Sequence, residues 1–330
     1  MSTISDTGFP NLADWAKRTK PGGGVADIVN VLTAKNPILD DIPFVETNEV
    51  DGHRITEALS LPSASWRKYN EGVAATKATT AQFVETVGMM EDESKVDVDL
   101  AKRNGDAVAY RASEDKLKKV GFGKQFASAA FYESANDNPE RIHGLTPRMP
   151  GTSGYTASAY TLAGSNSGVN CHSVWLISWE PGKVYGLYPK GSQAGLMVED
   201  KGEERVLDSN SRAFWAYITR MQWKVGIAVE DYRYMVRFQW DPDDAAFADD
   251  DRGMYLAMQE MLGTIFELLP STRFYMNRTS KKKLDAQLAS NDANFLTYIS
   301  PQGSSGMQIP AFMGVPIRIE DALVAETAIS

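Results

Sequence analysis

The chain has 330 residues, a length that allows two domains or one elaborated domain. Apolar residues make up 43% and charged residues 23%, which excludes a wholly disordered chain, a collagen-like chain and a small disulfide-stapled scaffold. The formal net charge of −9 argues against a dedicated nucleic-acid-binding protein, because such proteins usually carry an excess of basic residues.

The cysteine content and the N-terminus bear on the compartment. Cys171 is the only cysteine, so no internal disulfide can form and the chain suits a reducing environment. There is no basic residue before Lys17 and no apolar core, which excludes a signal peptide. The long uncharged stretch between Arg148 and Glu180 is too rich in polar residues to span a membrane. We expect a soluble protein that is intracellular when it is made.

Residues 1–48 are predicted to form an N-terminal arm. Proline and glycine break this segment repeatedly, yet it carries large apolar side chains that a solvated linker does not need, among them Phe9, Trp15 and Phe44. Two interpretations remain open. The arm either lies on another subunit or packs on its own domain.

Residues 54–90 predict a long antiparallel hairpin. The segment is rich in Thr, Ala and Val, and Gly72 lies near its centre. A two-stranded ribbon buries too little apolar surface to be stable alone, although this one carries Trp66, Tyr69 and Phe83. We therefore expect the arm and the ribbon to project from the body over neighbouring copies, with several of their aromatic residues exposed in a single chain.

A helical region follows the ribbon. Asp106 is a suitable N-terminal cap, and apolar residues around Phe126 recur at helical spacing. Gly121 and Gly123 are expected to kink or interrupt the helix, which should end near Ser134.

Several strands are predicted next. Residues 149–170 have the composition of a polar loop, and strands at 174–179 and 184–188 are separated by a turn typical of a hairpin. In residues 215–229 the large apolar side chains occupy odd positions, and in residues 232–240 they occupy even positions. Because strand side chains alternate, a bulge or turn must lie within about two residues of Glu230 and Asp231, with one alternating set buried on each side.

The C-terminal part alternates helices and strands. The predicted elements are an apolar helix over 254–269, a strand over 273–276, a short helix over 281–288 and a strand over 315–319. Lys281–Lys283 are interpreted as the solvated first turn of a helix capped by Thr279 or Ser280.

The residues show no catalytic constellation, no cofactor site and no metal site. His53, His143 and His172 lie far apart, and the adjacent Cys171 and His172 would point to opposite faces of a strand. A buried thiol beside a hydrogen-bonded histidine is the favoured interpretation. The aspartates in 241–251 lack the order of a calcium loop, and a self-repelling exposed loop is favoured.

Short motifs occur in a characteristic order along residues 40–325. They are Ile42-Pro-Phe44, Trp66-Arg67, Asn70-Glu71-Gly72-Val73, Phe131-Tyr132, Asn138-Pro139, Gly144-Leu145, the YPKGS segment at 188–192, Ala194-Gly195-Leu196, Glu199-Asp200, Trp223-Lys-Val-Gly226, 231–237, Tyr275-Met-Asn-Arg278 and 314–323. This order resembles the major capsid proteins of short-tailed bacteriophages, which share the Hong Kong phage-type capsid fold.

The resemblance implies an α+β fold with four parts. These are an N-terminal arm at 1–48, an extended β-hairpin loop at 49–104, a peripheral domain with a spine helix at 105–245, and an axial domain at 246–330. The residues expected at subunit interfaces are Trp15, Phe44, Trp66, Arg67, Tyr69 and Phe83.

The resemblance also implies a structural function without catalysis. Many copies would assemble, as hexamers and pentamers, into an icosahedral phage head around double-stranded DNA, in the cytoplasm of the bacterial host. The implied partners are a separate scaffolding protein, because the chain begins directly with the arm, a portal and a possible decoration protein. Contact with DNA is expected to be generic, and no membrane is involved.

Two alternatives remain at this point. A cellular nanocompartment shell has the same fold but encloses an enzyme. A soluble hydrolase that uses scattered Asp and His residues predicts a monomer with a deep pocket and shifted pKa values.

Overall fold

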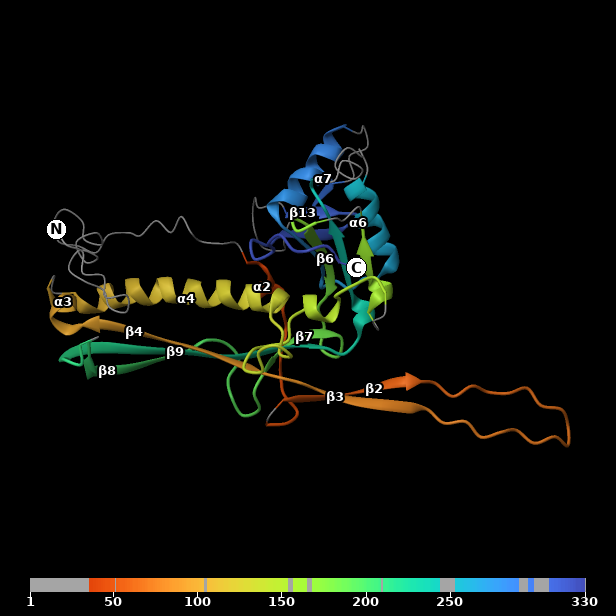
Figure 1. Cartoon of the computed structure of the whole chain (residues 1–330), viewed down its shortest axis with the longest axis horizontal. Helices are drawn as coiled ribbons and strands as arrows, with labels where there is room; N and C mark the ends of the chain where they lie inside the picture. The colour runs from red at the N-terminus through yellow and green to blue at the C-terminus, as the bar shows by residue number, and fades with distance from the viewer. Residues whose placement is uncertain are drawn as a thin grey trace.

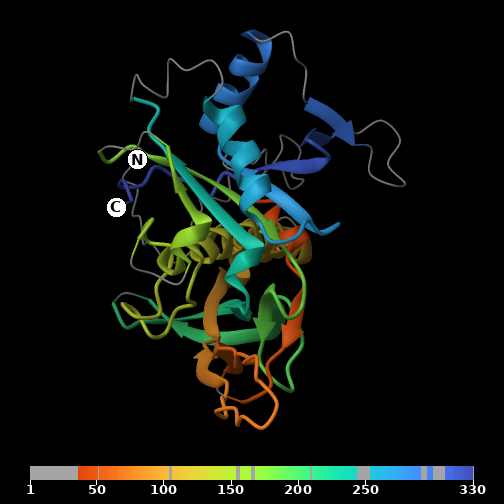
Figure 2. The ribbon, with the colours of Figure 1, turned by 90° about the vertical axis from the view of Figure 1, so that its right-hand side faces the viewer.

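The computed structural model describes residues 36–50, 52–103, 106–153, 157–164, 168–208, 210–243, 253–290, 296–299 and 309–329. These residues form two β-sheets, a separate two-stranded ribbon, and helices packed on the sheets (Figure 1). The mixture of helices and strands confirms the α+β class. In the view of Figure 2 the ribbon lies at the bottom of the molecule, and the second sheet with its helices lies at the top.

The first sheet has five strands around the long strand β9. They are, in spatial order, β1 (Phe44–Glu46), β7 (Val184–Tyr188), β9 (Ala213–Val229) and β4 (Gly88–Asp97), with β8 (Met197–Leu207) also paired to β9. β4 lies within the predicted extended loop at 49–104, yet it pairs with β9 along its whole length. β8 was not predicted, because most of its side chains are polar on both faces and the sequence shows no alternation of apolar and polar residues there.

Helices α3 (Val98–Lys102) and α4 (Ala107–Tyr132) pack on this sheet. The Asp106 side chain accepts a hydrogen bond from the Ala109 amide at 2.9 Å, which confirms the predicted cap. The expectation that Gly121 and Gly123 interrupt the helix is wrong, because α4 is continuous through both. Phe126, fully buried with its ring centroid 4.8 Å from that of Trp223, holds this part of α4 to the sheet. That packing outweighs the weak helix propensity of glycine.

The second sheet has seven strands. Their spatial order is β12 (Leu296–Ile299), β13 (Ile309–Phe312), β14 (Val315–Ile319), β11 (Thr272–Met276), β6 (His172–Ser178), β10 (Met235–Trp240) and β5 (Thr161–Ala163). β5, β6 and β10 precede the predicted domain boundary at 245, and β11 to β14 follow it. One sheet therefore contains strands from both sides of that boundary. β5 also lies within the predicted polar loop.

Both faces of the second sheet are covered near its centre. On one face Val174, Leu176 and Phe238 pack with α6 (Gly253–Thr264) and α7 (Arg278–Ser290), and on the other Trp175 and Ile177 pack with the end of α4. All six residues of β10 are consequently buried. The expectation that only one alternating set is buried in residues 232–240 is wrong for this reason.

The predicted break at Glu230 and Asp231 is confirmed. β9 ends at Val229, a short helix η3 (Tyr232–Tyr234) follows, and β10 begins in the other sheet. Along β9 the alternation of buried and partly buried residues holds from Thr219 to Val225, whereas Trp215 near its start is 60% exposed. The inversion of phase thus marks the segment in which the chain crosses from the first sheet to the second.

A second passage between the sheets lies beside the first. The predicted hairpin of 174–179 and 184–188 is wrong, because β6 and β7 belong to different sheets. The Glu230 amide donates to the Lys183 carbonyl at 2.7 Å, so the two passages are hydrogen-bonded to each other. A turn between two apolar strands predicts a reversal of the chain but not which sheet receives the second strand.

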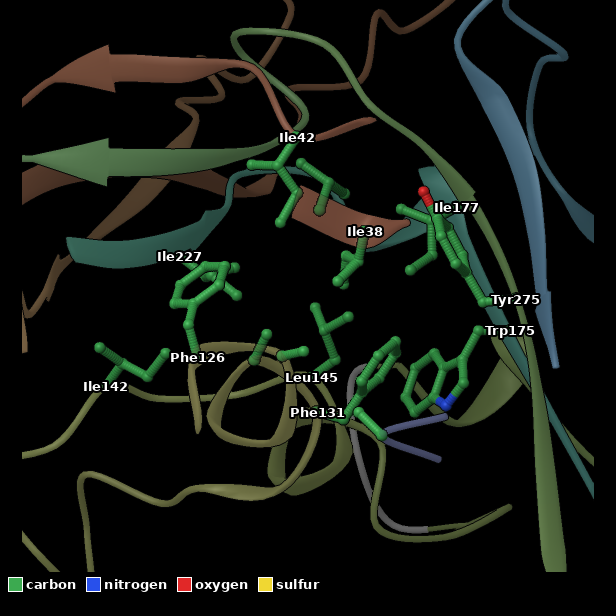
Figure 3. Packing of buried hydrophobic residues seen from close by; sticks show 14 of the residues in the cluster. Ile38, Ile42, Phe126, Phe131, Ile142, Leu145, Trp175, Ile177, Ile227 and Tyr275 are labelled. Carbon is green, nitrogen blue, oxygen red and sulfur yellow. The ribbon is translucent and has the colours of Figure 1, made fainter. Parts of the chain in front are cut away.

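The main core joins α4, the two sheets and the C-terminal end of the predicted arm, which therefore packs on its own chain (Figure 3). Ile38 and Ile42 enter this core from the short helix α2 (Ile38–Asp41) and the residue after it. The Tyr275 hydroxyl donates to the Asp41 carboxylate at 2.8 Å and accepts from the Trp179 indole at 2.8 Å. The chain is therefore firmly anchored at the point where the described residues begin.

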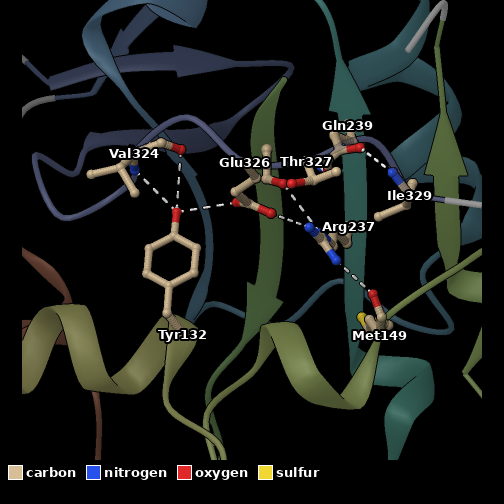
Figure 4. A network of polar contacts seen from close by, with 9 residues as sticks. Tyr132, Met149, Arg237, Gln239, Val324, Glu326, Thr327 and Ile329 are labelled. Carbon is tan, nitrogen blue, oxygen red and sulfur yellow. Dashed lines mark hydrogen bonds and ion pairs between the residues drawn. The ribbon is translucent and has the colours of Figure 1, made fainter. Parts of the chain in front are cut away.

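The C-terminal residues bind the end of α4 and β10 (Figure 4). Glu326 forms a buried ion pair with Arg237 and accepts a hydrogen bond from the Tyr132 hydroxyl at 3.1 Å. Arg237 also donates to the Met149 carbonyl at 2.6 Å, and Gln239 donates to the Thr327 carbonyl at 3.0 Å. These bonds connect four separate parts of the chain.

The C-terminal helices differ from prediction at their ends. α6 ends at Thr264 rather than Leu269. α7 begins at Arg278, and the Asn277 side chain accepts from the Ser280 amide at 2.9 Å, so the predicted cap at Thr279 or Ser280 is wrong. Among the described residues, no helix combines the length and apolarity needed to cross a membrane.

Candidate subunit interface

The ribbon consists of β2 (His53–Ser60) and β3 (Thr79–Glu85), which pair antiparallel from His53 opposite Glu85 to Ser60 opposite Thr79. The register shifts between Ala58 and Ser60. Residues 61–78 continue beyond the paired strands as a tip without regular structure. Every residue from 58 to 80 is exposed, so the body of the same subunit covers neither face of the outer ribbon.

Two aromatic side chains lie at the tip in full contact with solvent. Trp66 is 105% and Tyr69 97% exposed relative to a reference residue. A turn beside them is closed by a hydrogen bond from the Glu71 amide to the Lys68 carbonyl at 3.3 Å, with Asn70 in the left-handed region at a φ of 66°. Burying one large apolar side chain contributes about 1.5 to 3 kcal/mol, so a tip with two such groups gains appreciably from contact with a partner.

The root of the ribbon is its end next to the body, where His53 pairs with Glu85. In contrast to the tip, it is held by a buried ion pair. The Arg148 guanidinium, in the short helix η1 (Thr146–Arg148), binds both carboxylate oxygens of Glu85 at 2.5 and 2.7 Å. It also donates to the carbonyl oxygens of Gly144 and Ile227, which leaves few donors unused. Burial opposes the charge on Arg148, but its hydrogen bonds and the charge of Glu85 outweigh that effect and raise its pKa.

A second polar cluster anchors the other strand of the root. The Tyr185 hydroxyl donates to the Glu230 carboxylate and lies 3.0 Å from Nε2 of His53. Nδ1 of His53 accepts from the Asn48 amide at 3.3 Å. Burial, followed by the hydrogen bond and charge of Glu230, raises the pKa of Tyr185, so this hydroxyl stays protonated and remains a donor. Beside the cluster, Ile55 packs with the first sheet.

The structure separates the six predicted interface residues into three groups. Trp66, Arg67 and Tyr69 are exposed at the tip, as expected. Phe44 and Phe83 are only partly exposed because they pack on their own chain, so the expectation that several of the aromatic residues are exposed holds at the tip and not for these two. Trp15, like Phe9 of the arm, lies outside the described residues.

The partial burial of Phe44 and Phe83 has a simple cause. Phe44 lies in β1, which pairs with β7, and its ring centroid is 6.3 Å from that of Phe126 in α4. A Cβ at Gly186 would come within 2.5 Å of the Phe44 ring, so the glycine makes room for it. Phe83 packs against the cluster that contains Ile55.

Sequence reasoning missed the Glu85–Arg148 pair, although a signal for it exists. Glu85 follows Ala81 and Phe83 at alternate positions of β3, so it shares the inward face of the ribbon with them. An acidic residue on a face that otherwise carries apolar side chains predicts a buried carboxylate, and a buried carboxylate requires a basic partner. The sequence does not indicate which arginine supplies it.

Possible metal ligands and the Cys171–His172 pair are further candidate functional groups. No group of three or more potential metal ligands occurs in the part of the chain that the structure describes. Cys171 is fully buried, and Nδ1 of His172 lies 2.7 Å from the Asn277 amide nitrogen. The predicted buried thiol beside a hydrogen-bonded histidine is thus confirmed.

Comparison with known proteins identifies the family. Residues 20–329 match the profile of the family described as major capsid protein GP7. The chain belongs to this family. Its role is therefore that of a structural capsid protein of a virion, as the order of motifs implied.

Solved structures agree with the GP7 assignment. A chain in the near-atomic resolution structure of bacteriophage Epsilon15 is 26% identical, with a TM-score of 0.77 over 100% of this chain and 99% of that one. This similarity confirms the Hong Kong phage-type fold and the resemblance to capsids of short-tailed phages. Comparison with curated proteins gives no match.

More distant structures share only weak similarity with this capsid protein. The capsid of bacteriophage JBD30 has 8% identity and a TM-score of 0.49, over 97% of this chain and 96% of that one. The holo-SrpI encapsulin complex from Synechococcus elongatus has 9% identity and a TM-score of 0.44, over 69% and 94%. Similarity at this level carries no further argument.

Proposed function

We propose that this capsid protein assembles as hexamers and pentamers into an icosahedral phage head that encloses double-stranded DNA. The family match over residues 20–329 and the end-to-end similarity to the Epsilon15 capsid support this proposal. Its assembly takes place in the cytoplasm of the bacterial host, with a separate scaffolding protein, a portal and possibly a decoration protein as partners. Contact with DNA is generic, and the protein has no enzymatic role.

Within the subunit we propose a division that follows the sheets. The extended loop is the ribbon of residues 53–85, shorter than the 49–104 predicted from the sequence. The peripheral domain comprises the first sheet with α3 and α4 as the spine, and the axial domain comprises the second sheet with α6 and α7. The arm remains residues 1–48, although α2 and β1 at its end belong to the body.

The tip of the ribbon is the proposed contact with a neighbouring subunit. The observation that carries this proposal is the complete exposure of Trp66 and Tyr69 on a ribbon whose outer part, residues 58–80, is exposed throughout. Arg67 lies between them and adds a guanidinium suited to interfaces. Phe44 and Phe83 support the body and the root instead, and Trp15 remains a predicted contact.

Assembly of tip variants tests the proposal. Removal of both aromatic rings in Trp66→Ala/Tyr69→Ala should leave folded subunits that form few shells, measured by light scattering and electron microscopy. Trp66→Phe/Tyr69→Phe keeps two rings at the tip and should assemble nearly as the wild type does. Normal shells from the alanine variant would reject the tip as a contact.

The two alternatives have less support. The 26% identity to a phage capsid favours a phage head over a nanocompartment. For a hydrolase, the hollow of about 810 Å³ between α4 and β4 offers four carboxylates, of Glu91, Asp92, Glu133 and Glu140. Arg220, Lys118 and Arg141 pair with the first three at 2.7, 2.5 and 2.7 Å. No histidine or cysteine lines this hollow.

A further inference from the structure

Three exposed lysines of α4 have no ion-pair partner among the described residues. Lys116, Lys119 and Lys124 are exposed, and no carboxylate lies within 4.0 Å of their ammonium groups in the ranges that the structure describes. Two other basic residues of the same helix are neutralised from the sheet. Arg111 binds Asp200 at 2.6 Å, and Lys118 binds the carboxylate of a β4 residue. The unpaired charges are thus on the side of α4 that faces away from the sheet.

Helical geometry brings the three ammonium groups onto one half of α4. At 100° and 1.5 Å per residue, Lys119 and Lys124 lie about 60° to one side and about 80° to the other side of Lys116, and the three span about 12 Å along the axis. The small residues Ala112 and Gly123 help to leave a hollow of about 580 Å³ between α2 and α4, and Lys116 and Lys119 line it. The surface is therefore cationic and open.

The charge of the helix differs from that of the strands beneath it. α4 carries five basic and two acidic side chains, whereas β4 and β8 together carry eight acidic and three basic ones. In a chain of net charge −9, the outward side of α4 is a local exception. Asp115 is the only carboxylate among the residues that line the hollow, so the hollow keeps a net positive charge.

We propose that Lys116, Lys119 and Lys124 contact the backbone phosphates of the enclosed double-stranded DNA, and that the outward side of α4 consequently faces the lumen of the shell. The inference rests on the proposed function, because it requires a DNA-filled shell. Duplex DNA carries about one charge per 1.7 Å of its axis, so lysines spread over about 12 Å meet phosphates in any register. Such contacts position the duplex without reading its bases.

DNA suits this surface better than an acidic protein segment does. Stable protein interfaces usually centre on buried aromatic or large apolar anchors. α4 has no exposed aromatic residue, since Tyr110, Phe122, Phe126 and Phe131 are buried and Tyr132 is partly covered. Val108, in the first turn of α4, is an exposed apolar side chain, but it lies about 12 Å along the axis from Lys116. The surface around the three lysines matches a polyanion that is bound through charge.

Lysine acylation of DNA-filled and emptied wild-type particles tests the contact directly. Lys116, Lys119 and Lys124 should react at least about threefold more slowly in filled particles, because phosphate contact hinders their ammonium groups. Lys190 and Lys282, which are exposed elsewhere, should react equally in both. Equal reactivity of the α4 lysines in both particles would overturn the inference. Equal protection in both would also overturn it, since protein would then cover them.

A variant in which uncharged glutamines replace the three lysines provides a second readout. In Lys116→Gln/Lys119→Gln/Lys124→Gln, the plot of log K against log salt for binding of a DNA duplex by soluble subunits should become less steep. The magnitude of its negative slope should fall by up to about 2.7, about 0.9 for each lost phosphate contact. The matched control Lys190→Gln/Arg212→Gln/Lys282→Gln should keep the wild-type slope. Normal shells with an unchanged slope in the α4 variant would overturn the inference while leaving the shell function intact.

Discussion

The root and the tip of the β2–β3 ribbon belong to one hairpin, yet their surroundings are opposite. At the root, Glu85 and Arg148 form a buried pair, and Ile55 packs with the first sheet. At the tip, the side chains of Trp66 and Tyr69 are fully exposed. Folding of the subunit therefore fixes the point where the ribbon leaves the body. The side chains of Trp66 and Tyr69 stay exposed and available for association with another subunit. Stability and assembly should therefore respond to different substitutions.

The largest expected effect is at the root. Arg148→Met keeps most of the side-chain volume but leaves the Glu85 carboxylate buried without its partner. Loss of one member of a buried pair typically costs about 3 to 5 kcal/mol. The free energy of unfolding, measured by urea titration of subunits below the assembly concentration, should fall by that amount.

The double variant Glu85→Gln/Arg148→Met separates the pair from the packing around it. Replacing both charges removes the uncompensated carboxylate, so much of the lost stability should return. If Arg148→Met lowers the free energy of unfolding by less than about 1 kcal/mol, the root does not depend on this pair. Root and tip would then not differ in their contribution to stability.

A smaller effect, controlled by pH, distinguishes the stability of the body from that of the root. Glu320 is fully buried near the start of α2 and accepts from the Ile38 amide at 3.2 Å. Burial raises its pKa from 4.5 to about 8. The folded state therefore holds this proton more tightly than the unfolded state does. Stability should fall as the pH rises from about 4.5 to about 8, by a few kcal/mol in total.

Glu320→Gln removes this titration. The unfolding free energy of the variant should decline less than that of the wild type when both are measured by urea titration at pH 5, 6.5 and 8.5. Parallel pH profiles for the two proteins would show that Glu320 does not hold a proton in the folded subunit.

The smallest effect on folding is expected at the tip. Trp66→Ala removes the largest exposed side chain of the ribbon, but this side chain makes no packing contact in the subunit. Surface substitutions of this kind usually change stability by no more than about 0.5 kcal/mol. Thermal unfolding of the subunit measures it, and a loss of more than about 1.5 kcal/mol would show that the tip contributes to the subunit fold.

Much of the order of elements was predictable, because local signals mark it. Asp106 caps α4 as its position suggests, and the phase inversion at Glu230 located the end of β9. The sequence did not reveal that β10 continues in another sheet or that β6 and β7 do not form a hairpin. Pairing partners depend on long-range packing, and a turn motif does not encode them.

The candidate site shows the same limit. The exposed tip was predictable from Trp66 and Tyr69, because a two-stranded ribbon cannot bury them itself. Phe44 and Phe83 are also aromatic, yet the first sheet and α4 lie close enough to cover them partly. Apolar character alone does not distinguish a side chain that a neighbouring subunit must cover from one that its own chain covers.

Oxidative footprinting of assembled shells and free subunits is the most direct test of whether the tip lies on a neighbouring subunit, because it reports the exposure of Trp66 and Tyr69 in both states. Trp175, which is fully buried in the subunit, serves as the internal control and should be unreactive in both. If the tip lies on a neighbouring subunit, the oxidation rates of Trp66 and Tyr69 should fall by about an order of magnitude on assembly, because the partner excludes water. Equal oxidation rates of Trp66 and Tyr69 in shells and free subunits would show that the tip does not lie on a neighbouring subunit.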